Sequence, residues 1–296
     1  MYEAKLGDRS LFPTLAARAY LNHAAVSPPS IAVQEAVRTL LADYARRGVD
    51  AFATWIEQRH RLRGKLARLV NARPEDLGFA QSTTRALSDV ALCFPWRRGD
   101  RLLVFEGEFP ANVTPWQRAA ELFGLELRML PVAPFASDAD EALAAVEREL
   151  REGVRLVAVS LVQFQTGLRM PVEALGRLCA RHGAQLCVDG VQAVGAVPVD
   201  VAAMGIDYLA CGAHKWLMGL EGAAFLYVRP ERIAALRPVV AGWLSHEDGL
   251  GFLLRGPDLL RYDRPVRKRA DFIESGNLSG ASFAALEASV DLLLQL

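Results

Sequence analysis

The segment from Gln185 to Gly222, QLCVDGVQAVGAVPVDVAAMGIDYLACGAHKWLMGLEG, decides the fold. It contains two short apolar runs, at 186–188 and 206–211. The first run ends at Asp189 and a glycine, and the second leads into GAHK at 212–215. Short apolar runs closed by glycine are typical of buried strands in a parallel sheet. We therefore expect an α/β fold with this segment at its centre.

Asp189 and Lys215 would each follow one of these two strands. In open α/β sheets, ligands bind in the crevice beyond the carboxyl ends of the strands. Pyridoxal phosphate needs a lysine for a Schiff base and an aspartate that keeps its ring nitrogen protonated. The alternative is a solvated loop carboxylate and a surface amine. Taken alone, these two residues favour the surface interpretation.

The residues around them favour the cofactor. The run VDGVQAVGAVPVDV (188–201), followed by GAHK and a glycine loop, closely resembles the core of the class V aminotransferase family. These fold type I pyridoxal-phosphate enzymes include cysteine desulfurases, kynureninases and isopenicillin-epimerase-like proteins. The resemblance extends from YLNHAAVSP (20–28) to ESGNLSG (274–280). It implies an α/β large domain of fold type I, a mostly parallel sheet with helices on both faces, and pyridoxal 5'-phosphate as the cofactor.

The composition restricts the partners and the compartment. The 296 residues have a formal net charge of +0, which leaves no electrostatic footprint for nucleic acid or an anionic membrane. The four cysteines lie in apolar segments without CxxC spacing, so we expect small buried side chains rather than disulfides or a metal site. No signal peptide or membrane-spanning run is recognisable. We expect a soluble, cytoplasmic protein without a bound metal.

Helical and extended patterns alternate along the chain. They predict right-handed βαβ crossovers between parallel strands. We divide the chain into an N-terminal arm (1–19), a large domain that binds pyridoxal phosphate (20–246), and a segment (247–296) that forms a dimer interface and begins a small C-terminal domain. The last helix is still apolar-periodic where the sequence stops, so we expect that small domain to be incomplete. In relatives it carries the arginine that pairs with the substrate carboxylate.

The resemblance implies a set of cofactor contacts. Thr83 and Thr84 match a phosphate-binding pair at a helix start, where free N–H groups and the helix dipole attract anions. Gln192 matches a ligand of the ring hydroxyl, and His214 matches a phosphate ligand. Gly212 stands where many relatives have a phosphate-binding serine, so its backbone N–H would substitute.

Three other positions differ from the desulfurase pattern. Phe109 takes the place of a histidine that stacks on the cofactor ring, and an aromatic side chain keeps the stacking. Phe164 takes the place of an asparagine that contacts cofactor and substrate. Beside it, Gln163 is our candidate for the missing polar contact with the substrate, and we also expect His23 to contact the substrate. Asn277 matches a threonine that reaches the cofactor phosphate of the partner subunit, which predicts a homodimer with shared active sites.

Lys215 and Asp189 are the expected catalytic residues of an enzyme that acts on a small-molecule amino acid. The reaction implied first is transamination, as in a class V aminotransferase. The alternatives are a cysteine desulfurase or other C–S lyase, an epimerase of the same family, and an inactive binding subunit with the same fold. We exclude a nicotinamide-dependent dehydrogenase because no G-x-G-x-x-G follows the first strand.

Overall fold

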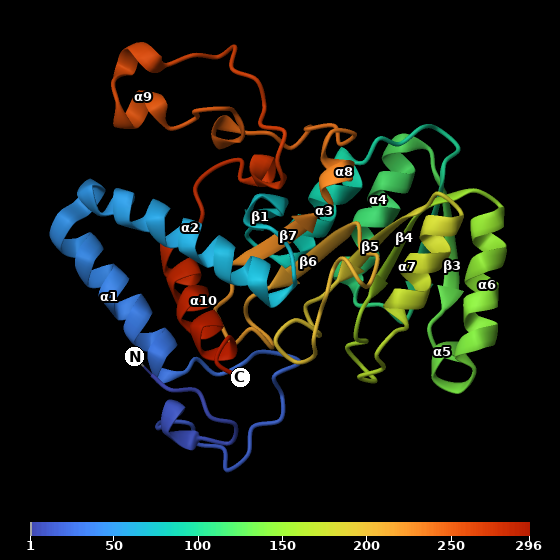
Figure 1. Ribbon diagram of the computed structural model, residues 1–296, viewed down its shortest axis with the longest axis horizontal. Coiled ribbons are helices and arrows are strands. Elements are labelled where there is room, and N and C mark those ends of the chain that lie inside the picture. Colours follow the sequence, from blue (N-terminus) through green and yellow to red (C-terminus); the bar gives the residue numbers. More distant parts are fainter. Residues whose placement is uncertain (1) are drawn as a thin grey trace.

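A computed structural model describes residues 2–296 of the chain (Figure 1). One sheet contains the strands β1 (Leu77–Ala80), β2 (Arg101–Glu106), β3 (Glu126–Pro131), β4 (Val154–Ser160), β5 (Gln185–Asp189), β6 (Tyr208–Gly212) and β7 (Ala224–Val228). The α-helices are α1 (Ile31–Arg47), α2 (Phe52–Leu69), α3 (Thr83–Cys93), α4 (Thr114–Phe123), α5 (Pro134–Ser137), α6 (Ala139–Arg151), α7 (Val172–Arg181), α8 (Pro230–Ile233), α9 (Gly251–Leu254) and α10 (Gly280–Leu293).

The strand order across the sheet is β1-β7-β6-β5-β4-β2-β3. The neighbours from β6 through β5, β4 and β2 to β3 pair in parallel. Strand β7 is antiparallel to both β6 and β1, so β1 runs in the same direction as the other five. The predicted α/β fold with a mostly parallel sheet is confirmed, and β7 is the one reversed strand. The carboxyl ends of the six codirectional strands therefore meet at one edge.

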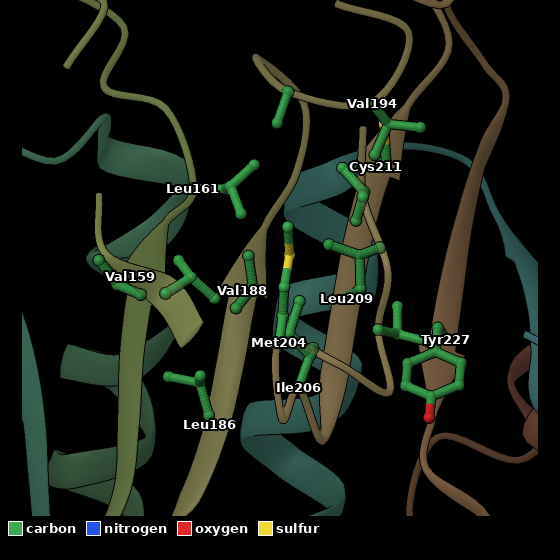
Figure 2. Close-up of a cluster of buried hydrophobic side chains, with 14 of the residues drawn as sticks. Val159, Leu161, Leu186, Val188, Val194, Met204, Ile206, Leu209, Cys211 and Tyr227 are labelled. Carbon is green, nitrogen blue, oxygen red and sulfur yellow. The ribbon is translucent and has the colours of Figure 1, made fainter. Parts of the chain in front are cut away.

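Alternate side chains of the central strands enter two separate cores. Val157 and Val159 of β4 belong to one core, and Leu156 and Ala158 belong to the other. Figure 2 shows the first core, where side chains of β4, β5, β6 and β7 pack together. Continuous apolar runs are required here because helices cover both faces of the sheet. The expected three-layer arrangement follows directly from these runs.

The helices divide between the two faces. Buried residues of α2, α6, α7 and α10 contribute to the first core, and those of α3 and α4 contribute to the second. Helix α1 begins where Ser30, its N-cap, accepts a hydrogen bond from Val33 N at its Oγ, at 3.3 Å. Among residues 2–296, no helix is long and apolar enough to cross a membrane.

The segment after β7 has two parts with different surroundings. Residues 247–269 with α9 extend away from the rest of the molecule in Figure 1. Helix α10, in contrast, packs against α1 and α2, and its Phe283 and Leu286 are fully buried in the first core. The division of the chain at residue 246 stays a prediction.

Candidate active site

A cavity of about 520 Å³ opens beside the carboxyl ends of the strands. Its volume lies in the usual range of about 300–1,000 Å³ for small-molecule sites. Predicted site residues and several others line it: Asn22, Ala24, Ala25, Ser82, Thr83, Thr84, Phe109, Ala111, Phe164, Asp189, Val191, His214 and Lys215. The strand-end crevice expected from the sequence is therefore present.

Asp189 is the last residue of β5 and is 2% exposed. Val191 N donates a hydrogen bond to its Oδ1 at 2.9 Å. Burial raises the pKa of Asp189 to about 7 from its usual 3.8, and the nearby Glu108 carboxylate adds to this rise. The Val191 hydrogen bond and the Lys215 charge act in the opposite direction. The result is a carboxyl group poised to hold or share a proton near neutral pH.

Lys215 follows β6, the parallel neighbour of β5, and is 9% exposed. Burial lowers the pKa of its amine, while the charge of Asp189 partly opposes this effect. Its Nζ lies 5.4 Å from the centroid of the Phe109 ring. A lowered pKa leaves a larger share of the amine unprotonated, which a lysine needs before it can act as a nucleophile or a base.

Helix α3 points its N-terminus into the cavity through Thr83 and Thr84. The first N–H that bonds within this helix belongs to Ala86, and Ser82 Oγ accepts from Arg85 N at 3.1 Å. The N–H groups of the first helical residues precede these donors and are free for an anion. Thr83 Oγ1 is buried and has no hydrogen-bond partner among residues 2–296. An unpaired hydroxyl beside a helix N-terminus suits a bound phosphate.

Gly212 ends β6 beside this helix. A Cβ at Gly212 would lie 2.9 Å from Thr83 Oγ1 and 3.3 Å from His214 Nδ1. A side chain at position 212 would therefore require Thr83 or His214 to shift. His214 itself lines the cavity, and burial lowers the pKa of its imidazole, with the charge of Lys215 adding to the effect. Gly212 does not line the cavity.

Gln192 is buried outside the cavity lining. Its Nε2 donates to Ala24 O at 2.9 Å, and its Oε1 accepts from Trp216 Nε1 at 2.9 Å. Both ends of the amide are thus used to tie the N-terminal segment to the loop after Lys215. The predicted contact with a ring hydroxyl stays a prediction.

His23 is not among the residues that line the cavity. Its ring packs between Tyr20 and Trp216, with centroid distances of 5.1 and 5.5 Å. Its Nδ1 is 2.7 Å from Ser27 Oγ, which donates to Lys215 O at 2.6 Å. In this position His23 supports the lysine loop, while Asn22, Ala24 and Ala25 line the cavity. The predicted contact of His23 with the substrate stays a prediction.

Gln163 and Asn277 also lie outside the lining. Gln163 is 3% exposed, and its Nε2 donates to Glu108 Oε1 at 2.8 Å. Asn277 is exposed at the surface. The roles predicted for them, in substrate contact and in the partner's site, stay predictions.

Sequence reasoning did not identify the residues that hold this site together. Glu108, Asn112 and Ser160 form a buried hydrogen-bonded network, and Glu108 directly precedes Phe109 of the cavity lining. Val191 and Ala111 were also missed. An aliphatic or polar residue in a strand-exit loop carries no local signal for such contacts.

The fold and the site together define an α/β protein whose cavity combines a buried lysine, a buried aspartate and a helix N-terminus. The donor set fits pyridoxal phosphate: an amine for its aldehyde, a carboxyl for its ring nitrogen and N–H groups for its phosphate. The family model for class V aminotransferases matches residues 19–246. The chain belongs to the class V aminotransferase family, and pyridoxal phosphate is the cofactor of that family.

Individual relatives cover most of the chain. The uncharacterized aminotransferase YcbU of Bacillus subtilis is 28% identical over 96% of this chain and 72% of its own length. A cysteine desulfurase of Dickeya dadantii is 33% identical over 92% of this chain and 65% of its own length. A solved structure of the cystine C–S lyase C-DES with its product cysteine persulfide superposes with a TM-score of 0.85. That match has 25% identity and covers 96% of this chain and 74% of that one.

Proposed function

We propose that this chain binds pyridoxal phosphate covalently through Lys215 and is the cofactor-binding part of an enzyme that acts on a free amino acid. The observation that carries the proposal is the placement of Lys215 and Asp189 at the ends of neighbouring parallel strands, in one cavity with the start of α3. When bound, the cofactor withdraws electrons from the α-carbon of an attached amino acid.

The chain's own residues have distinct tasks in this proposal. Asp189, shielded from water, would hold the proton of the ring nitrogen. Thr83, Thr84 and the N-terminus of α3 would hold the phosphate, and His214 lies beside them. The Phe109 ring offers an apolar face close to Lys215 Nζ. Lys215, once free, would carry a proton to or from the substrate α-carbon, since burial lowers the pKa of its amine and so favours the unprotonated form.

Among the family's reactions, we propose transamination first. The four cysteines within residues 2–296 are all buried. Burial raises the pKa of the Cys93 thiol to about 11 and that of Cys179 to about 12, and it raises the other two thiols well above their usual value. A sulfur-transfer enzyme needs an accessible thiolate. These cysteines do not supply one.

A C–S lyase is the second candidate because of the similarity to C-DES. Incubation of the protein with pyridoxal phosphate and single amino acids separates the two reactions. Transamination predicts one equivalent of 2-oxo acid without sulfide or ammonia. Release of sulfide from cysteine, or of cysteine persulfide from cystine, together with ammonia would replace transamination by the lyase. Inversion at the α-carbon would indicate an epimerase. Cofactor binding without any turnover would support a binding subunit.

We also propose a homodimer with shared sites. Asn277 is exposed in the single chain, as a residue that serves a partner's site would be. A two-fold axis would place both copies of Asn277 equivalently.

A further inference from the structure

Glu108 is a buried carboxylate that no part of the proposed chemistry uses. It is 7% exposed and lies in the loop after β2. Its Oε1 accepts from Ser160 N at 2.7 Å and from Gln163 Nε2 at 2.8 Å. Its Oε2 accepts from Asn112 Nδ2 at 3.1 Å and from the Ser160 hydroxyl. All four donors are neutral groups, so hydrogen bonds alone offset the cost of burying this charge.

These bonds join separate parts of the chain. Ser160 ends β4 and is the register partner of Asp189 on β5, while Gln163 lies in the loop after β4. Asn112 closes the loop that contains Glu108, and its Oδ1 accepts from Trp116 Nε1 of α4 at 3.0 Å. The carboxylate thus connects two strand-exit loops to the sheet and to α4.

The two connected loops carry the two aromatic rings of the cavity. Phe109 follows Glu108 directly, and Phe164 follows Gln163 directly. Their rings meet edge to face, with centroids 5.2 Å apart and planes at 81°. Both rings line the cavity, and Lys215 Nζ lies over the Phe109 ring. The hydrogen bond between Glu108 and Gln163 therefore spans the same two loops as the ring contact.

We propose that Glu108, with Gln163 as its partner, is a positioning residue that fixes the Phe109–Phe164 ring pair against which the bound cofactor packs. This inference rests on the proposed function, because it takes pyridoxal phosphate as the ligand that the ring pair contacts. The inference explains why the Gln163 amide donates to Glu108 and is not part of the cavity lining. It also explains why a carboxylate is buried beside Asp189, where its negative charge opposes ionisation of that group.

Gln163→Leu tests this role with little disturbance of the fold. Gln163 Oε1 is buried without a partner among residues 2–296, so leucine removes an unsatisfied acceptor. Glu108 keeps three of its four donors. We expect the melting temperature to change little. Affinity for pyridoxal phosphate, measured by absorbance titration of the full chain, should fall by about tenfold, as expected when a well-placed ring contact is lost.

A double-mutant cycle shows whether the effect passes through the rings. In a Phe164→Leu background, Gln163→Leu should weaken binding by less than about twofold, because the ring pair is already gone. The isosteric change Glu108→Gln places an NH₂ group among donors and should weaken binding at least as much as Gln163→Leu. Asp207→Asn is the matched control: a buried carboxylate at the opposite edge of the sheet, which accepts from Leu186 N at 2.8 Å and Arg232 Nε at 2.8 Å. It should lower the melting temperature and leave the affinity unchanged.

The outcomes separate this inference from the proposed function. A wild-type chain that binds no pyridoxal phosphate overturns both. Wild-type binding together with unchanged affinity in Gln163→Leu and Glu108→Gln overturns only the role of Glu108. So does a Gln163→Leu effect that persists in full without Phe164. If Glu108→Gln does not fold, Gln163→Leu and the cycle decide alone.

Discussion

Replacing Asp189 by asparagine should stabilise the cofactor-free protein, and by more as the pH rises. Asp189 is 2% exposed, and burial raises its pKa from 3.8 to about 7. Between these two values the folded chain holds a proton that the unfolded chain has lost. Stability therefore falls as the pH rises through this range and levels off above about pH 7. Asparagine keeps the acceptor for Val191 N and carries no charge.

The size of the effect follows from the shift. About 3 pKa units correspond to about 4 kcal/mol between the fully protonated and fully ionised limits. Of this, about 2.5 kcal/mol develops between about pH 5 and pH 8, the range in which unfolding is readily measured. The free-energy difference between variant and wild type should grow by about this amount, since the pH dependence of groups that do not interact with Asp189 cancels in the difference.

Urea unfolding of the cofactor-free proteins at several pH values measures this growth. Asp89→Asn is the matched comparison, because Asp89 is also 2% exposed and burial raises its pKa to about 6, against the opposing effect of Arg85. The difference in unfolding free energy between Asp89→Asn and wild type should level off about one pH unit lower than that of Asp189→Asn. The Asp89→Asn protein should still bind pyridoxal phosphate. Asp189→Asn should bind the cofactor more weakly and lower turnover by about 10²–10³-fold. A stability difference for Asp189→Asn that does not change between pH 5 and pH 8 would refute the reasoning.

Three further predictions concern other parts of the site. Thr83→Val should leave the melting temperature nearly unchanged, because Thr83 Oγ1 has no partner among residues 2–296, but it should weaken the binding of pyridoxal phosphate by about tenfold. Equal affinities of variant and wild type would remove Thr83 from the phosphate site. Mass spectrometry should show that the four buried thiols resist alkylation in the native protein and react only on unfolding. A cysteine that is rapidly modified in the native protein would contradict the case against sulfur transfer. If Asn277→Ala alone weakens cofactor binding, mixing Lys215→Ala and Asn277→Ala subunits should restore wild-type-like cofactor affinity in one site of the mixed dimer. A mixture whose affinity does not exceed that of the Asn277→Ala protein would exclude shared sites.

The positions of Asp189 and Lys215 could be predicted because local sequence determines them. Asp189 ends one short apolar run and Lys215 follows another closely, each run is closed by a glycine, and parallel pairing brings the two strand ends to one edge. Thr83 and Thr84 were equally accessible, since a helix start has a local sequence pattern.

The contacts of Gln192 and Gln163 could not be predicted in the same way. The amide of Gln192 bonds to Ala24, 168 positions away, and that of Gln163 bonds to Glu108, 55 positions away. A glutamine side chain can serve a ligand or the protein itself equally well. Only the packed structure shows the internal partners of these amides, so the resemblance could suggest ligand contacts but not the hydrogen bonds that this chain makes to itself.

Covalent attachment at Lys215 is the central claim, and reduction with borohydride tests it most directly. The chain has four lysines, Lys5, Lys65, Lys215 and Lys268, so peptide mapping after reduction assigns the label without ambiguity. Lys65 is engaged by Glu287 and Asp291 at 2.8 and 2.7 Å, whereas burial lowers the pKa of Lys215 inside the cavity. We predict one pyridoxyl group per chain, on Lys215 alone. Label on any other lysine, or a reduced protein without label, would contradict the account.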